Sequence, residues 1–295
     1  MSTISAPVLA ASASSVLVSP SGGGIKYRRL LDIISSLGSA LVAFSGGVDS
    51  SFLCHAAAAA LGKKALAATI VSPMLPRRER RFAADMARLI GIEHLLIDEP
   101  EIDETVAANP GNRCYFCKRI EFGALLRAAA DRGIAAVLDG SNADDPADYR
   151  PGLRALEELG IKSPLREAGL TKDEIRALSK QFRLPSWDKS SFACLASRIP
   201  YGERISTEKL SRIEKAEEAL WKAGFRQFRV RSHGDMARIE VSPGERRRFF
   251  NESLLDDLSK KIKSAGFVYA AFELEGYVMG SMNRVLKENH ENPAL

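Results

Sequence analysis

The sequence has few cysteines and histidines for its length and lacks any long uninterrupted run of apolar residues. Its 295 residues include four cysteines and four histidines. So few cysteines do not suit the disulfide framework of a secreted domain, and we expect a reducing compartment, the cytoplasm. No apolar run is long enough to cross a bilayer, so we expect no membrane partner. The histidines show no metal-ligand spacing with one another, which favours structural roles for them.

Composition and charge exclude little more. The residues are 45% hydrophobic and 27% charged, which is ordinary for soluble globular proteins, and the length allows about two domains. A net charge of +5 suits small phosphate-bearing molecules and nucleic acid equally. The first 24 residues have no charged side chain and are rich in Ser, Ala and Val. They lack the basic residues of a secretory signal or a transit peptide, so we expect a loose tail.

One stretch combines the end of an apolar strand, two glycines and the start of a helix. It reads Ala43-Phe44-Ser45-Gly46-Gly47-Val48-Asp49-Ser50-Ser51. Adjacent glycines let successive N–H groups converge on a concave anion site, where the dipole of the following helix also favours negative charge. The stretch lacks the Gly-Lys-Ser ending of a Walker A motif, so no lysine is expected to reach the terminal phosphates. The pattern predicts a phosphate site, with a serine-rich turn that binds nothing as the alternative.

Apolar runs and helical patterns alternate regularly around this loop. Strands are expected at 40–44, 65–71, 94–97 and 135–138, with helices at 25–37, from 48, from 76, and from the capping box at 171–174 to 182. This alternation predicts an α/β fold, a parallel sheet with helices on both faces. The polar stretch 139–145 follows a strand, at the carboxyl edge where such sheets bind ligands.

Composition changes near residues 200–203, and a second, smaller domain is expected after that point. A charged helix at 207–223, strands near 225–231 and 237–241, a helix from Ser242-Pro243 and a strand at 267–274 make an α-β-β-α-β unit. We therefore expect a tail at 1–24, a nucleotide-binding domain at 25–203, a small α/β domain for substrate binding and oligomer contacts at 204–288, and a tail at 289–295.

Cys114 and Cys117 lie three residues apart near the start of a helix expected at 112–130. They share one helix face, where the helix dipole, Arg113 and Lys118 should favour thiolates. Thiolates are what metal or sulfur chemistry requires. Two incidental cysteines packed beneath a helix are the alternative.

A third cysteine, Cys194, lies in a loop of small residues four positions before Arg198, which could lower the thiol pKa or hold a phosphate. Zinc would need a fourth ligand besides these three cysteines, so three thiolates suit an iron–sulfur cluster better. Cys54 lies in an alanine-rich helix and is expected in the core.

Five ordered motifs resemble known families. Ser-Gly-Gly-Val-Asp-Ser matches the PP-loop of the ATP pyrophosphatases in all six letters; this superfamily includes NAD and GMP synthetases and tRNA thiolases, and it cleaves ATP to AMP and pyrophosphate. With four further segments, the chain resembles the LarE family from about Ile25 to Asn283. Those segments are Asn-Arg-Cys-Tyr-Phe-Cys-Lys, Gly-Ser-Asn-Ala-Asp-Asp, Cys-Leu-Ala-Ser-Arg-Ile-Pro-Tyr-Gly and Arg-Val-Arg-Ser-His-Gly-Asp-Met-Ala-Arg-Ile-Glu. The resemblance implies a PP-loop sheet of the adenine nucleotide alpha-hydrolase-like type.

LarE proteins are ATP-dependent sulfur transferases that build the nickel-pincer nucleotide cofactor of lactate racemase. The resemblance implies adenylation of a carboxylate of pyridinium-3,5-biscarboxylic acid mononucleotide, followed by sulfur insertion to give a thiocarboxylate. Attaching AMP gives a poor electrophile a good leaving group, while Mg2+ and loop amides stabilise pyrophosphate. The expected partners are this small-molecule nucleotide and further copies of the chain in a homo-oligomer, with no nucleic acid.

The resemblance also suggests roles for individual residues. The stretch from Ala43 to Ser51 would hold the ATP phosphates, with Asp49 near magnesium. Thr69 and Ser72 would meet the adenosine, and Gly140, Asn142 and Asp144 would flank the same crevice. The expected catalytic residues are Cys114, Cys117, Cys194, Asp49 and Arg198.

Four arginines are candidates for binding the phosphate and carboxylates of the substrate, because a planar guanidinium group pairs with such anions two bonds at a time. They are Arg198, Arg229, Arg231 and Arg238. Arg229 and Arg231 share one face of a strand, so they could converge on one anion or equally face water.

Two sulfur sources and two other functions remain open. Some family members have only the cysteine that matches Cys194 and sacrifice its sulfur, leaving dehydroalanine. In members with all three cysteines, the thiolates resemble ligands of a [4Fe-4S] cluster whose fourth iron holds an extra sulfide, and this route is favoured here. The alternatives are a tRNA thiolase, for which we find no appended RNA-binding motif, and a non-catalytic nucleotide- or metal-sensing module.

Overall fold

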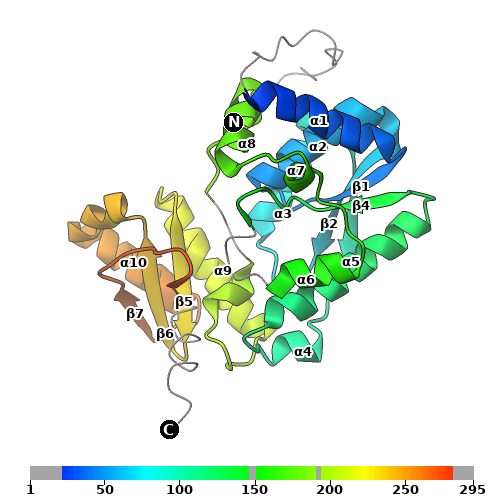
Figure 1. The fold of residues 1–295 in the computed structure, drawn as a ribbon. Helices are drawn as coiled ribbons and strands as arrows, with labels where there is room; N and C mark the ends of the chain where they lie inside the picture. The colour runs from blue at the N-terminus through cyan, green and yellow to red at the C-terminus, as the bar shows by residue number, and fades with distance from the viewer. Residues whose placement is uncertain (1–21, 146–150, 191–193, 282–295) are drawn as a thin grey trace, which may run out of the picture. The chain divides into compact units, whose positions relative to one another are not determined.

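The computed structural model describes residues 22–145, 151–190 and 194–281 (Figure 1). They form two compact units. The described part of the large unit comprises 22–100, 114–145 and 151–190, and that of the small unit comprises 101–113 and 194–281. The small unit thus includes residues 101–113, which the expected boundary after 203 would leave with the large one. Backbone bonds such as Ile205 N to Ala107 O, 2.8 Å, join these two segments.

The large unit is built on a four-stranded parallel sheet with strand order β3-β2-β1-β4. The strands are β1 (Ala40–Ala43), β2 (Ala65–Val71), β3 (Glu93–Asp98) and β4 (Ala136–Leu138). Ala40 of β1 is paired with Ala65 of β2 and with Ala136 of β4, so the carboxyl ends of these strands meet at one edge. The predicted parallel sheet is confirmed.

Helices cover both faces of this sheet, as predicted (Figure 1). One face packs against α1 (Gly22–Ser36), α2 (Val48–Leu61), α3 (Arg77–Ile90) and α8 (Lys172–Gln181), and the other against α5 (Arg113–Ala130) and α6 (Pro151–Glu158). Neighbouring strand residues point to opposite faces, so Val42 joins the first core and Leu41 the second. The short elements of this unit are η1 (Gly62–Lys64) and α7 (Pro164–Glu167), whereas α4 (Glu104–Ala107) belongs to the small unit.

Helix ends follow local sequence signals. The capping box is present: Thr171 accepts a hydrogen bond from Glu174 N, and Glu174 accepts one from Thr171 N. Helix α1 begins at Gly22, so the segment expected as a tail contributes its last residues to a helix. The remainder of that tail, and the one expected at 289–295, lie outside the described residues.

The small unit contains a three-stranded sheet in the order β5-β6-β7. Its elements are η3 (Leu195–Arg198), α9 (Thr207–Lys222), β5 (Phe228–His233), β6 (Met236–Val241), η4 (Pro243–Phe250), α10 (Glu252–Ser264) and β7 (Tyr269–Phe272). The expectation of one helix from Ser242 was wrong, because the segment forms two helices, the 3-10 helix η4 and the α-helix α10. Asn251 separates them: its backbone is extended, and its side chain caps α10 by accepting a hydrogen bond from Leu254 N.

No helix among the residues that the structure describes is both long and apolar enough to cross a membrane.

Candidate active site

The glycine loop joins β1 to α2 at the carboxyl edge of the large sheet. Gly46 has φ +71°, and a Cβ there would lie 3.3 Å from backbone atoms of Ala83, so both the conformation and the close approach require glycine. Gly47 is the N-cap of α2 and has no side chain to occupy the first amides of the helix. Those amides and the helix dipole are therefore available to an anion.

The three serines of the glycine loop differ in where their hydroxyl groups lie. Ser45 Oγ and Ser50 Oγ lie 3.1 Å apart, and Ser50 Oγ donates to Gly47 O at 3.3 Å. Ser51 is fully buried, and its hydroxyl has no hydrogen-bond partner among the described residues. Ser45 and Ser50 thus lie at the curl, whereas Ser51 lies within the core.

The polar stretch 139–145 packs against the start of α2, as expected. A Cβ on Gly140 would lie 3.2 Å from Ser50 N. Asn142 Nδ2 donates to Asp49 Oδ1 at 3.3 Å, which brings these two predicted residues together. Asp144 has a different role: its carboxylate accepts from Lys172 N at 2.7 Å and so caps the start of α8.

Two lysines from distant parts of the sequence lie at the loop, although the loop has none of its own. Lys172 Nζ forms an ion pair with Asp49, and its side chain is 33% exposed. Lys189 Nζ donates to Gly46 O at 2.9 Å and pairs with Glu79 at 2.7 Å. Burial lowers the pKa of Lys189, and the charge of Glu79 opposes that shift. Both lysines lie more than 120 residues from the loop in the sequence, and no local pattern near either one indicates a contact with it. The sequence analysis therefore did not identify them.

The two residues expected near adenosine differ in exposure: Thr69 is buried and Ser72 is partly exposed. Thr69 is buried, and its hydroxyl donates to Phe44 O at 2.6 Å and lies 2.8 Å from His94 Nε2. Burial also lowers the pKa of His94. Thr69 therefore ties β2 to the loop, and His94 has the structural role expected of it. Ser72 directly follows β2 and is partly exposed.

Cys114 and Cys117 lie in the first turns of α5, the former exposed and the latter partly exposed. The Cys117 thiol donates to Glu121 Oε1 at 3.4 Å, and Lys118 Nζ meets the other Glu121 oxygen at 3.1 Å. Glu121, with a contribution from Cys117, raises the pKa of Lys118. The expected basic neighbour of the thiols is thus present at Lys118.

The other expected neighbour, Arg113, is buried in the small unit and donates to Ala196 O at 3.2 Å. Cys194 is exposed and also belongs to the small unit. Cys54 is fully buried in the core as predicted, and burial raises the pKa of its thiol. Among the described residues, no three Cys, His, Asp or Glu side chains form a metal-binding group.

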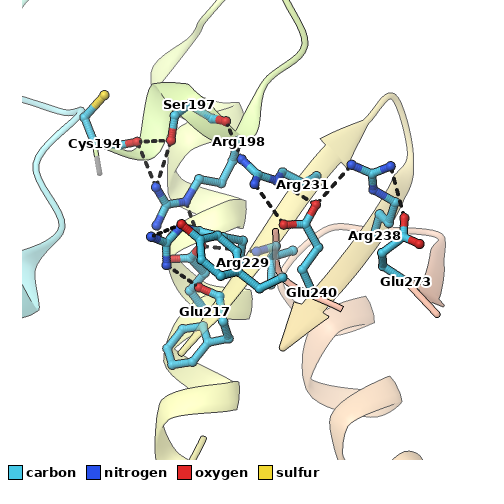
Figure 2. Close-up of polar contacts among 12 residues, drawn as sticks. Cys194, Ser197, Arg198, Glu217, Arg229, Arg231, Arg238, Glu240 and Glu273 are labelled. Carbon is cyan, nitrogen blue, oxygen red and sulfur yellow. Dashed lines mark hydrogen bonds and ion pairs between the residues drawn. The ribbon is translucent and has the colours of Figure 1, made fainter. Parts of the chain in front are cut away.

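Three of the four candidate arginines, Arg198, Arg231 and Arg238, form ion pairs with glutamates within the small unit (Figure 2). Arg198 is fully buried and forms two bonds to Glu217, at 2.8 and 3.1 Å. Arg231 forms two bonds to Glu240, at 3.0 and 2.8 Å. Guanidinium groups buried at this depth require such carboxylates, because an unpaired buried charge is very costly.

The other two arginines differ in exposure. Arg229 is 2% exposed, lies 4.7 Å from the ring centre of Tyr277 and has its pKa lowered to about 10 by burial, with Arg198 contributing. It does not face water, and neither does the buried Arg231. The Arg238 side chain is 29% exposed and pairs with Glu240 and Glu273.

Comparisons with known proteins agree with this geometry. The sequence model of the Asparagine synthase family matches residues 36–148. The chain is 43% identical over 262 residues to the uncharacterized protein slr1717 of Synechocystis, covering 88% of this chain and 98% of that protein. It is 34% identical over 266 residues to the pyridinium-3,5-bisthiocarboxylic acid mononucleotide synthase of Lactiplantibacillus plantarum, covering 88% of this chain and 95% of that enzyme.

A more distant relative is a glutamine-hydrolyzing GMP synthase polypeptide of Pyrococcus furiosus, 25% identical over 226 residues, which cover 70% of this chain and 71% of that polypeptide. Similarity to the mononucleotide synthase along nearly the whole of both chains, in a fold with the glycine loop at its sheet edge, fixes the assignment: this chain belongs to the LarE family, that of the pyridinium-3,5-bisthiocarboxylic acid mononucleotide synthases.

Proposed function

We propose that this protein uses ATP to adenylate a carboxylate of pyridinium-3,5-biscarboxylic acid mononucleotide and then inserts sulfur to form the thiocarboxylate, in synthesis of the nickel-pincer cofactor. The observation that carries the proposal is the 34% identity to a synthase of that name over 88% of the chain. The geometry of the large unit supports it, because the glycine loop and the free first amides of α2 lie together at the carboxyl edge of the sheet, an arrangement that suits phosphate.

The glycine loop supplies the phosphate chemistry. A substrate carboxylate oxygen attacks the α-phosphorus of ATP, and the bond from that phosphorus to pyrophosphate breaks. The negative charge that develops on pyrophosphate faces the amides at the start of α2 and the hydroxyl groups of Ser45 and Ser50. Gly46 and Gly140 contribute by packing: the absence of a Cβ lets the backbone of Ala83 approach Gly46 and lets the start of α2 approach Gly140.

Asp49 is the proposed magnesium carboxylate, since oxygen donors at a phosphate site suit this ion. Bound magnesium would neutralise charge on the phosphates. The Asp49 carboxylate forms an ion pair with Lys172 and accepts a hydrogen bond from Asn142. It therefore faces the polar loop 139–145, to which Asn142 belongs. With Asp49 holding the metal, the Lys172 ammonium group would be free to pair with a phosphate oxygen. Lys189 instead holds the loop through Gly46 O.

The sulfur would come from a cluster held by three cysteines. Cys114 and Cys117 are one helical turn apart, and the Cys194 thiol is exposed, so all three suit thiolate ligation of a [4Fe-4S] cluster. Such a cluster would supply sulfur that is replaced between turnovers. In the competing route, the Cys194 sulfur attacks the acyl carbon, AMP leaves, and loss of the Cα proton with cleavage of the Cβ–S bond leaves dehydroalanine.

The cysteine variants separate these two routes. In the cluster route, Cys114→Ala or Cys117→Ala removes the iron-dependent absorbance of anaerobically purified protein and stops multiple turnover. In the sacrificial route, both variants retain one round of transfer, and mass spectrometry of spent protein finds residue 194 lighter by one hydrogen sulfide.

Among the four arginines, Arg238 is the one we propose for a substrate anion, because 29% of its side chain is exposed whereas the other three are buried.

The function is tested by incubating anaerobically purified protein with magnesium, ATP and the pyridinium dicarboxylate nucleotide. We expect AMP and pyrophosphate to form only when the nucleotide is present, together with a thiocarboxylate product. Formation of AMP with tRNA but not with the nucleotide would favour a tRNA thiolase. ATP binding without AMP release would favour a sensing module.

A further inference from the structure

The segment that begins at Cys194 has its carbonyl groups fixed by side chains. The segment contains a single turn of 3-10 helix, Leu195–Arg198. The carbonyl oxygen of Cys194 accepts from Ser197 N at 3.1 Å, Ser197 Oγ at 2.9 Å and Arg198 Nη1 at 3.0 Å. Three donors on one oxygen fix the peptide that follows the cysteine.

Two further buried arginines reach the next carbonyl groups. Arg113 donates to Ala196 O at 3.2 Å, and Arg231 donates to Ser197 O at 2.8 Å. Both residues are 4% exposed. Arginine suits this role because its rigid fork of donors can bind a carboxylate on one side and a carbonyl on another.

The guanidinium groups are themselves held in place. Glu217 binds Arg198, and Glu240 binds Arg231, each through two bonds (Figure 2). Glu217 also accepts from Val230 N at 3.1 Å, which anchors this pair to β5. The position of the Cys194 backbone is therefore set by the sheet of the small unit.

Asn109 extends the same arrangement. It is fully buried with φ +56°, its side-chain oxygen accepts from Arg113, and its Nδ2 donates to Pro200 O at 2.6 Å and Glu203 O at 2.9 Å. A buried non-glycine residue in a left-handed conformation persists where its surroundings demand it. Here the demand is the set of carbonyl bonds made by its amide.

Cys194 is exposed, and its sulfur points away from the guanidinium groups of Arg198 and Arg231 (Figure 2). We propose that Arg113, Arg198 and Arg231 are positioning residues: they hold the Cys194–Ser197 backbone so that the Cys194 thiol is presented for sulfur transfer. The proposal rests on the proposed function for the role of that thiol. It assigns Arg198 and Arg231 to the protein backbone, where the sequence suggested contact with substrate anions.

The first test measures order in the segment without any reaction. Arg231→Lys keeps the charge beside Glu240 but loses the forked donor that reaches Ser197 O. Arg238→Lys is the matched control, because the Arg238 guanidinium pairs with the carboxylates of Glu240 and Glu273 rather than with a carbonyl group of the Cys194 segment. Hydrogen–deuterium exchange in the peptide from Cys194 to Pro200 should accelerate about tenfold or more in Arg231→Lys, as expected for loss of one charged hydrogen bond. It should be unchanged in Arg238→Lys. Equal exchange in Arg231→Lys and wild type would overturn the proposal.

Ser197→Ala provides a second variant that leaves every buried charge in place. It removes the Oγ that donates to Cys194 O and accepts from Arg198 Nη1 at 2.9 Å. Ser197 is only partly buried, so the variant should fold even if Arg231→Lys does not. Faster exchange in the same peptide supports the proposal, and unchanged exchange contradicts it.

The second test separates positioning from substrate binding. The ratio of thiocarboxylate to AMP should fall several-fold in Arg231→Lys, with KM for the nucleotide unchanged, because adenylation proceeds while transfer fails. A raised KM with an unchanged ratio would show that Arg231 binds substrate. If wild type forms no AMP, the proposed function has failed, and the exchange measurements still decide the positioning role.

Discussion

The two units of this protein bury different kinds of side chain. In the large unit, both faces of the sheet pack against apolar residues, and the polar groups of the candidate site gather at the carboxyl edge. In the small unit, charged pairs lie inside: Glu217 is 2% exposed and Glu240 is 1% exposed. The candidate site of the large unit thus lies at the backbone amides of a strand–helix turn, whereas the buried polar groups of the small unit are paired side-chain charges.

This difference predicts different consequences of mutation. Substitutions at the edge of the large sheet should remove activity and leave stability nearly intact, because the core lies elsewhere. Substitutions in the buried pairs of the small unit should cost stability first, because each leaves a charge buried without its partner.

The largest effect is expected at Asp49. Asp49→Ala should lower nucleotide-dependent AMP release by at least about 100-fold, a loss comparable to removal of one preorganised charge-stabilising group. The thermal midpoint should stay close to that of wild type. Asp173→Ala, an exposed carboxylate on α8, is the matched control and should retain full activity. Undiminished AMP release by Asp49→Ala would remove this residue from the mechanism.

A large stability effect is expected at Glu217. Glu217→Gln leaves Arg198 buried without its charge partner and should lower the free energy of unfolding by about 3–5 kcal/mol. Glu218→Gln is the control, since that side chain is 43% exposed and pairs with Lys222 on the helix surface. It should cost less than about 0.5 kcal/mol. Urea titrations measure both, and equal stabilities for the two variants would contradict the contrast between the units.

In the large unit, the ionisable group expected to matter most for acid stability is His55. Burial lowers its pKa to about 4, from 6.5, and its ring lies 4.5 Å from that of Phe182. Because the folded pKa is depressed, the stabilising contribution is complete above pH 6.5 and is lost as the pH falls towards 4.

Replacing His55 by Gln should therefore flatten the stability profile over that range. The difference in unfolding free energy between pH 7 and pH 4 should shrink by about 3 kcal/mol, since one pKa unit corresponds to about 1.4 kcal/mol. Urea unfolding at a series of pH values gives the profile. An unchanged slope in the variant would show that His55 is not the group responsible.

A smaller effect is expected at Lys172. Lys172→Met should raise KM for ATP about tenfold, because one charged contact to a phosphate oxygen is lost. Lys180→Met on the same helix is the control, since that ammonium group lies over the Trp187 ring, 4.6 Å from its centre. Steady-state AMP formation at varied ATP measures both, and identical KM values would place Lys172 outside the phosphate site.

The sequence predicted the large unit well because its signals are local. The glycine pair, the apolar strands and the capping box at Thr171 each act within a few residues, and all appear where expected. Asp49 and Asn142 could be placed together because both follow strands whose ends meet at one sheet edge.

The contacts that sequence reasoning missed are tertiary. Lys172 meets Asp49 across 123 positions, and Asn109 meets Glu203 across 94. The partners of the arginines were missed for a related reason: a glutamate on a charged helix pattern, such as Glu217, is expected to be solvated. Only the packing of α9 against β5 makes it a buried partner of Arg198.

The central claim is that a substrate carboxylate is adenylated and then exchanges oxygen for sulfur. It is tested most directly by giving the protein ATP and nucleotide whose carboxylates contain isotopically heavy oxygen, and by measuring the mass of the AMP released. The account predicts one heavy oxygen in the phosphate of each AMP, because the attacking carboxylate oxygen leaves with it. AMP without the label, formed by attack of water on ATP, would contradict the claim.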